Sequence, residues 1–410
     1  MLQPTDAAED NFFGSDIALV DGVLYVGAPG RVNGGTSGTG AVYAFDAVTL
    51  AELNTYIASN TAPTPEPSFF GTSIAVEGTN LLVGSSEPDP SDPDKAGAAY
   101  LIDLAAGAQV HRFTQTMGDF GTRTRDFGDE VALAGNLAIV ADPNADRNPT
   151  GAGISGTVNF YDITTGQQVE RLLASFQAYG AGFGRVIEVR DNEVYIGARA
   201  AGGMRVYDAQ DRSVITTLVP PIPPQGFARE IARFGSTLAT GNSTFSPGEL
   251  FETDIFLYNL DTEQVVQIID IDPDPGTLGL GQTLAINDRY LLATRSRVPE
   301  MVFGNNVVVF DPQTGDLLGE IEPPVGFERG FGLRMALNGD TAYVYAEANP
   351  AFPRAGSAVL VYDLTRLGDC AADINGDGEL TPADFNAWVL AFNAQAPECD
   401  QNGDSVCDPS

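Results

Sequence analysis

Short apolar runs dominate the first 365 residues, and turns rich in Gly, Asp and Asn separate them. The runs Leu24–Gly27 and Val194–Gly197 are examples, and each follows a tight polar turn. Runs of this length between turn residues are typical of β-strands and are too short for helices. A content of 46 Gly and 26 Pro agrees with many turns between short strands. The pattern therefore predicts an all-β fold for this region.

One structural unit repeats seven times along these residues. Each copy opens with a Phe-Gly pair or a close variant, and successive copies start 44 to 57 residues apart. The pairs are Phe13-Gly14, Phe70-Gly71, Phe127-Gly128, Phe183-Gly184, Phe227-Ala228, Leu280-Gly281 and Phe331-Gly332. An inner strand follows each pair, then a second strand and a third, and a fourth strand follows in the first six copies. The third strand ends in an aromatic residue and Asp in five copies, as in Phe45-Asp46 and Tyr161-Asp162. Four antiparallel strands per unit predict a seven-bladed β-propeller of four-stranded blades over residues 1–365.

The seventh unit lacks a good fourth strand after Asp363, whereas residues 1–12 resemble the segment before each Phe-Gly pair. We therefore expect the N-terminus to supply or border the outer strand of the last blade. Residues 1–5 should then lie beside residues 357–363. This arrangement would close the ring.

Two positions break the apolar-Ala-apolar rule of the inner strands. Glu188 stands where the other six copies have Ala, and Arg233 stands where the others have Ile, Leu or Val. Neighbouring strand positions point to opposite faces, and opposite faces of consecutive blades can meet. The two residues therefore form one inter-blade ion pair if Glu188 points toward blade five; otherwise each needs another partner or water. Unpaired burial of either charge would cost several kcal/mol.

The repeat resembles a known family. The Phe-Gly starts, the Val-Gly-Ala-Pro of Val26–Pro29 and the Gly-x-Val-Tyr of Gly40–Tyr43 resemble FG-GAP repeats, which form the propeller of integrin α subunits. The resemblance extends over residues 1–365. It implies the same propeller architecture that the repeat predicts.

The C-terminal tail carries different chemistry. Residues 366–372 read as a linker, and residues 373–384 place oxygen side chains at loop positions 1, 3, 5, 9 and 12 with Gly at position 6. This spacing is that of an EF-hand calcium loop. The predicted ligands are Asp373, Asn375, Asp377, Glu379 through its backbone carbonyl, Thr381 and Asp384. Pro382 then begins a predicted helix whose apolar face carries Trp388.

A second loop follows that helix, with predicted ligands Asp400, Asn402, Asp404 and Asp408. It ends one residue short of its terminal ligand, so this site is incomplete within the sequence. Two such loops around one helix resemble the dockerin module of secreted bacterial proteins. The resemblance implies a calcium-binding module over residues 373–410 and a possible cohesin-like partner. Since so short a segment rarely folds without metal or crosslinks, we expect calcium to order it.

All three cysteines, Cys370, Cys399 and Cys407, fall in the last 41 residues. Their place beside calcium loops suggests a disulfide and an extracellular or cell-surface location. We favour a Cys370–Cys399 bridge, with Cys407 left for a partner beyond the sequence. A Cys399–Cys407 bridge is the alternative.

The net charge of the chain bears on which classes of partner it can bind. The 410 residues carry a formal net charge of −34, which argues against nucleic acid and anionic membranes. No apolar run approaches the length of a membrane-spanning helix, so we expect no transmembrane segment.

The connections between second and third strands and those between blades are the longest, and both emerge on one side of a propeller, here called the long-loop face. Function tends to reside on such loops. Nine arginines lie in or beside them: Arg31, Arg123, Arg125, Arg147, Arg199, Arg295, Arg297, Arg329 and Arg354. The loop that begins at Asp142 alternates oxygen side chains and is a weaker calcium candidate.

We expect a secreted or surface interaction protein that binds a protein or glycan on this face and is attached through its tail. Sequence offers little for catalysis, because the single histidine, His111, falls in a fourth strand and no Ser-His-Asp set can be assembled. The alternative is an extracellular polysaccharide lyase or hydrolase. Carboxylate pairs brought together by folding would serve such an enzyme.

Overall fold

The computed structural model describes residues 1–6, 11–32, 38–58, 69–86, 97–115, 126–145, 156–173, 182–198, 203–219, 227–242, 254–270, 277–297, 305–348 and 356–367. Residues 1–362 form one compact unit and residues 363–410 a second. Of the second unit, only residues 363–367 are described, and they include the 3-10 turn η1 (Leu364–Arg366). The predicted EF-hand loops, their helix and the cysteines lie outside the described residues and stay predictions.

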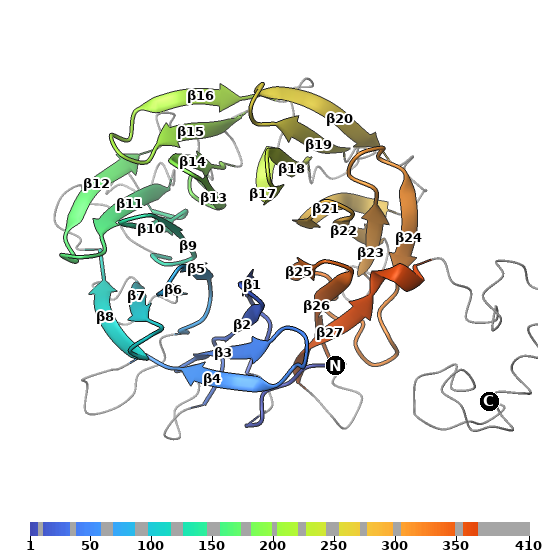
Figure 1. Ribbon diagram of the computed structural model, residues 1–410, viewed down its shortest axis with the longest axis horizontal. Coiled ribbons are helices and arrows are strands. Elements are labelled where there is room, and N and C mark those ends of the chain that lie inside the picture. Colours follow the sequence, from blue (N-terminus) through green and yellow to red (C-terminus); the bar gives the residue numbers. More distant parts are fainter. Residues whose placement is uncertain are drawn as a thin grey trace, which may run out of the picture. The chain divides into compact units, whose positions relative to one another are not determined.

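The first unit is a ring of seven antiparallel sheets in sequence order (Figure 1). Blade 1 contains β1 (Ile17–Val20), β2 (Val23–Ala28), β3 (Ala41–Asp46) and β4 (Glu52–Tyr56). Blade 2 contains β5 (Ile74–Glu77), β6 (Asn80–Ser85), β7 (Ala98–Asp103) and β8 (Ala108–Phe113). Blade 3 contains β9 (Glu130–Ala134), β10 (Leu137–Asp142), β11 (Thr157–Asp162) and β12 (Gln168–Leu173).

Blade 4 contains β13 (Ile187–Arg190), β14 (Glu193–Ile196), β15 (Met204–Asp208) and β16 (Val214–Leu218). Blade 5 contains β17 (Phe227–Phe234), β18 (Thr237–Asn242), β19 (Asp254–Asn259) and β20 (Gln264–Asp270). Blade 6 contains β21 (Thr277–Ile286), β22 (Leu291–Arg297), β23 (Asn305–Phe310) and β24 (Leu317–Ile321). Blade 7 contains β25 (Met335–Asn338), β26 (Thr341–Glu347) and β27 (Ser357–Asp363). The predicted seven-bladed, all-β propeller is confirmed.

The core lies between blades, because each apolar cluster combines residues of two neighbours. Phe13 and Tyr43 of blade 1, for example, pack with Tyr343 and Val359 of blade 7. This packing explains the repeated Phe, which is fully buried in blades 1, 2 and 3. A single blade would expose both of its apolar faces to water, and closing the ring buries them all.

An Asp ends or directly follows the third strand of every blade except blade 5, which has Asn259, and this residue makes a turn. In blade 3, the Asp162 carboxylate accepts hydrogen bonds from the backbone N–H groups of Thr164 and Thr165 at 3.0 and 2.7 Å. These bonds hold the pKa of the Asp162 carboxyl below its usual range. Gly166 then takes a φ of +72°, which glycine adopts without steric cost. In blade 3, this turn directs the chain from the third strand β11 into the fourth strand β12.

The N-terminus closes the ring as predicted. Leu2 forms an antiparallel bridge to Val359 of β27, with backbone N···O distances of 2.7 and 3.1 Å. The Leu2 side chain is 4% exposed. Four residues later, the Asp6 carboxylate accepts hydrogen bonds from Arg31 and from the Tyr43 hydroxyl, both at 2.6 Å. The described sheet of blade 7 therefore has three strands, and the first residues border its outer strand β27 through this single bridge while Asp6 is anchored on blade 1.

Candidate functional site

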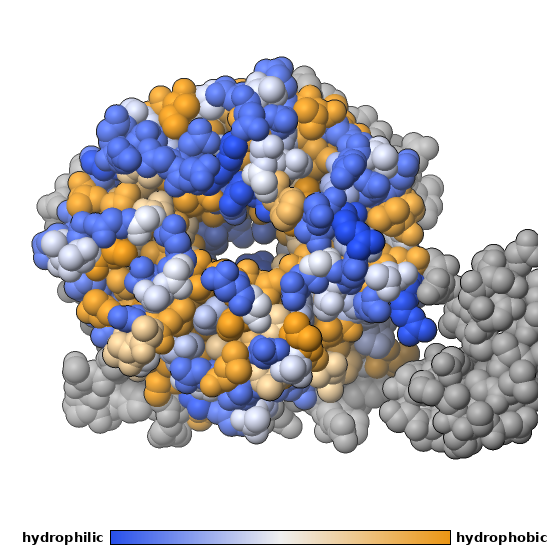
Figure 2. All heavy atoms as spheres, viewed as in Figure 1, coloured by the Kyte–Doolittle hydropathy of each residue, from blue (hydrophilic) through white to orange (hydrophobic). Residues whose placement is uncertain are grey.

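A channel of about 930 Å³ runs through the middle of the ring and is lined by the seven inner strands β1, β5, β9, β13, β17, β21 and β25. Figure 2 shows its opening at the centre of the molecule. Each inner strand pairs on one side only, so its other edge turns toward the channel. Among the described lining residues, seven carboxylates face three guanidinium groups. The channel is therefore polar and predominantly acidic.

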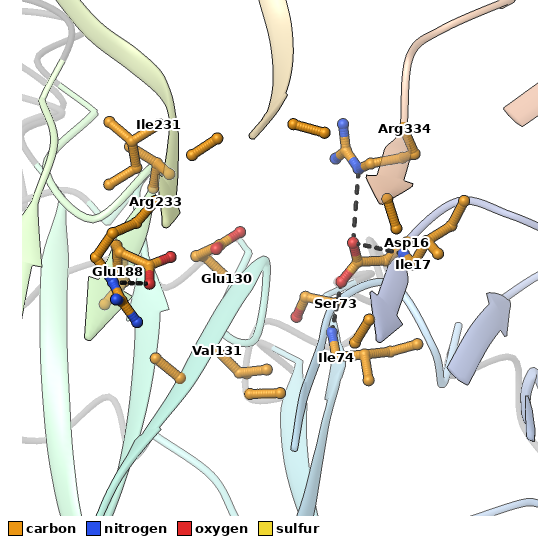
Figure 3. A pocket seen from close by; sticks show the side chains of 18 of the residues that line it. Asp16, Ile17, Ser73, Ile74, Glu130, Val131, Glu188, Ile231, Arg233 and Arg334 are labelled. Carbon is orange, nitrogen blue, oxygen red and sulfur yellow. Dashed lines mark hydrogen bonds and ion pairs between the residues drawn. The ribbon is translucent and has the colours of Figure 1, made fainter. Parts of the chain in front are cut away.

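Four charges share one repeat position at a mouth of this channel, three residues after the Phe of each pair. They are Asp16, Glu130, Glu230 and Arg334. Arg334 Nε lies 3.8 Å from Asp16 Oδ1 (Figure 3). The same carboxylate accepts a 2.6 Å hydrogen bond from the backbone N–H of Ile74 in blade 2. Asp16 therefore links blades 7, 1 and 2.

Burial raises the pKa of Asp16, and Arg334 opposes that rise. The effect on Glu130 is larger. Burial, followed by repulsion from Asp16 and Glu230, raises the pKa of Glu130 well above its usual value, and Arg334 offsets part of the rise. A carboxyl group that retains its proton to higher pH beside an ionisable partner can act as a proton donor.

The predicted ion pair between blades 4 and 5 is confirmed. Arg233 Nε lies 3.0 Å from Glu188 Oε1, and the two side chains are 26% and 30% exposed (Figure 3). Arg233 also donates to the backbone carbonyls of Val189 and Gly235 at 3.2 and 3.1 Å. Burial raises the pKa of Glu188, and Arg233 opposes this rise. The pair therefore links the inner strands β13 and β17 of neighbouring blades.

A second cavity of about 610 Å³, here called the mouth pocket, adjoins the channel and shares Thr72, Leu333 and Arg334 with it. Its other lining residues are Phe12, Gly14, Ser15, Pro29, Phe69, Ser86, Asp126 and Tyr345. Several belong to blade-to-blade segments or to connections between second and third strands. The mouth pocket therefore opens on the long-loop face.

The structure describes the side chains of only some of the nine arginines that the sequence predicted for binding. Three of the nine loop arginines are placed in ion pairs, Arg31 with Asp6, Arg295 with Glu320 and Arg329 with Glu347. Side chains of the other six lie outside the described residues. These three arginines therefore pair with carboxylates of the same chain.

Two of the remaining candidates, His111 and Asp142, lie within the described residues. His111 lies in β8, the outer strand of blade 2, as predicted. Asp142 is buried, and its carboxylate accepts a 3.3 Å hydrogen bond from the backbone N–H of Asp126. The rest of that loop, from residue 146 on, and all predicted calcium ligands of the tail lie outside the described residues. Within the ranges that the structure describes, no helix is long and apolar enough to cross a membrane.

Known structures share the fold. The β-propeller domain of Cps50 (Swd1) from Myceliophteria thermophila superposes with a TM-score of 0.57 at 14% identity, covering 86% of this chain and 97% of that one. The WD40 domain of Neurospora crassa Pan2 gives a TM-score of 0.50 at 11% identity, covering 80% and 85%. No family model and no curated protein matches the sequence. The chain is a seven-bladed β-propeller, and what it shares with these two structures is the fold.

Sequence reasoning missed the charged ring at the channel mouth. A signal was present, because Asp16, Glu130, Glu230 and Arg334 occupy one column of the repeat. The corresponding residues of blades 2, 4 and 6 are Ser73, Val186 and Thr283. A search for charged residues at this repeat position, in addition to the search for exceptions at the Ala position two residues later, would have predicted the site.

Proposed function

We propose that this protein is a secreted or cell-surface binding protein that takes up a partner protein or glycan on the long-loop face of its propeller. The mouth pocket carries the proposal. Its size lies in the range of ligand pockets, and rigid inner strands hold it at the edge of the channel. Loops above a rigid scaffold are a common place for recognition.

The tail gives this proposal its second part. The dockerin-like residues 373–410 bind calcium and attach the propeller to another component, with a cohesin-like domain as a candidate partner. The FG-GAP-like motifs, known from integrin α propellers, agree with an extracellular binding role. Support comes from the ligand spacing of the loop that begins at Asp373 and from the three cysteines beside the loops.

A glycan array probed with the full chain in calcium tests the binding role, and hydrogen exchange on any retained glycan then maps the contact. We expect protection in the blade-to-blade segments around residues 11–15 and 69–73, with the turns at residues 47–50 and 163–166 unchanged. Those turns lie between third and fourth strands, away from the long-loop face. Protection confined to these turns would refute the assignment of the face.

One observation favours a second candidate, an extracellular polysaccharide lyase or hydrolase. Glu130 has a raised pKa and lies in the channel mouth with Asp16. Paired carboxyl groups with separated pKa values are the usual acid and base of glycoside cleavage. If the protein is such an enzyme, Glu130→Gln should abolish product formation while glycan binding persists.

A further inference from the structure

The repeat provides an internal reference for the residues of the mouth pocket. At the position just before the Phe-Gly pair, blades 4 to 7 carry glycine, at Gly182, Gly226, Gly279 and Gly330, and blade 3 carries Asp126. Blades 1 and 2 instead carry Phe12 and Phe69. Both phenylalanines line the mouth pocket. Two neighbouring blades therefore place an aromatic side chain where most blades have none.

These aromatic residues strain the backbone. Phe12 has a φ of +52° and Phe69 a φ of +51°, close to the +60° of Gly182 and the +59° of Gly330. Glycine adopts this left-handed region freely, whereas a bulky residue does so only at an energetic cost. Phe12 also remains 45% exposed, so burial of its ring offsets only part of that cost. Leu50 and Arg212 share this strain in turns between strands, but Phe12 and Phe69 differ from them because both line one cavity.

A third departure from the repeat lies in the same pocket. Two residues after the Phe of each pair, six blades carry a polar residue: Ser15, Thr72, Asp129, Arg185, Arg229 and Gln282. Blade 7 carries Leu333, which is 39% exposed and lines the pocket. Three adjacent blades, 7, 1 and 2, have therefore each replaced a small or polar residue by an apolar one around a single cavity.

The charge beside this apolar surface is negative. Asp126 lines the mouth pocket, and Asp16, Asp129 and Glu230 line the channel, where these carboxylates outnumber the guanidinium groups of Arg185 and Arg334. Arg334 lines both cavities, and its Nε lies 3.8 Å from Asp16 Oδ1. The whole chain carries a net charge of −34. A positively charged partner is thus favoured at this mouth.

We infer that the mouth pocket binds a polypeptide segment that packs an apolar side chain against Phe12, Phe69 and Leu333 and directs a basic side chain toward the acidic channel mouth. This inference rests on the binding role proposed above and names its partner class. A sugar fits less well, because its hydroxyl groups need hydrogen-bond partners. The Thr72 hydroxyl already donates to the Phe69 carbonyl at 2.7 Å, and the Ser15 hydroxyl to the Gly71 carbonyl at 3.4 Å.

The repeat also supplies matched substitutions that preserve the fold. Phe69→Gly copies the residue of blades 4 to 7, Leu333→Thr copies blade 2, and Asp129→Ser copies blade 1. Val48→Thr serves as the control, because Val48 is an exposed apolar residue in the turn between β3 and β4, on the opposite face. Circular dichroism verifies that each variant stays folded.

The experiment selects a phage-displayed library of random peptides on the full chain in calcium and measures dissociation constants of enriched peptides by fluorescence anisotropy. We expect enriched peptides to combine a basic residue with a nearby apolar one. Phe69→Gly and Leu333→Thr should weaken their binding at least tenfold, Asp129→Ser several-fold, and Val48→Thr should leave it unchanged. Higher salt should weaken it as well.

Several results would overturn the inference. They are a selection with no enrichment, enriched peptides without basic residues, and peptide affinities unchanged in Phe69→Gly and Leu333→Thr. A glycan that binds the wild type and is lost in the same two variants would assign the pocket to carbohydrate, which refutes the peptide while it upholds the binding role. Failure of both the peptide and the glycan arms would refute the inference and the binding role together.

Discussion

The ion pair between Glu188 and Arg233 gives the most quantitative prediction. Arg233→Ala removes a charge-assisted hydrogen bond of 3.0 Å and two bonds to backbone carbonyls, and it leaves Glu188 in the channel without its cation. Hydrogen bonds to charged groups contribute about 1.5–3 kcal/mol, and breaking a fully buried pair costs about 3–5 kcal/mol. Since both side chains are about a quarter to a third exposed, we expect Arg233→Ala to lower the free energy of unfolding by about 2 kcal/mol.

The double variant should behave differently. Glu188→Ala with Arg233→Leu restores the residues that other blades carry, so its stability should lie within about 1 kcal/mol of the wild type. Scanning calorimetry or circular dichroism is the suitable assay, because the only tryptophan, Trp388, belongs to the tail and the ring sequence contains none. A double variant as unstable as Arg233→Ala would show that the pair is not coupled and refute the reasoning.

The pH dependence supplies an internal check on this prediction. Burial already raises the pKa of Glu188 against the opposing effect of Arg233. In Arg233→Ala that opposition is lost, so the folded state favours protonated Glu188 even more. A raised carboxyl pKa gives stability at low pH that is lost as pH rises through it. The deficit of Arg233→Ala should therefore be smaller at pH 4.5 than at pH 7.5, and a deficit independent of pH would contradict the mechanism.

Three further predictions follow from single features. Glu130→Gln should raise the melting temperature more at pH 8 than at pH 4.5, because the raised pKa of Glu130 makes its ionisation unfavourable in the folded state; calorimetry at both pH values tests this. Leu2→Ala should cost about 2–3 kcal/mol in urea unfolding, because it empties a buried site where the N-terminus closes the ring, and an unchanged midpoint would contradict that closure. Calcium chelation should change the Trp388 fluorescence while the circular dichroism of the β-propeller persists; unchanged fluorescence would contradict a calcium-ordered tail.

The fold could be predicted because its signals are local and repeated. A Phe-Gly pair, a strand pattern and an Asp turn each lie within a few residues, and seven copies reinforce one another. The Glu188–Arg233 pair could also be predicted. Neighbouring strand positions point to opposite faces, and these faces meet between consecutive blades. The ring closure by Leu2 was equally accessible, because the last blade lacked a strand.

The site was harder to predict because it depends on how the ring brings distant residues together. Asp16 and Arg334 are separated by more than three hundred residues, yet they lie 3.8 Å apart across the junction of blades 7 and 1. The mouth pocket draws on four blades, and the left-handed backbone of Phe12 has no sequence signature when the aromatic residue replaces the expected glycine. Phenylalanine rarely adopts a left-handed backbone, so the sequence does not predict this conformation at Phe12, where the backbone places the ring in the pocket.

The central claim is that this propeller binds its partner without transforming it. The most direct test incubates the full chain, in calcium between pH 5 and pH 8, with every glycan that it retains, and follows reducing ends and unsaturated products over time. We predict no product above that of heat-inactivated protein with any glycan that is retained. Steady release of product by the wild type, abolished in Glu130→Gln, would contradict the claim and identify an enzyme.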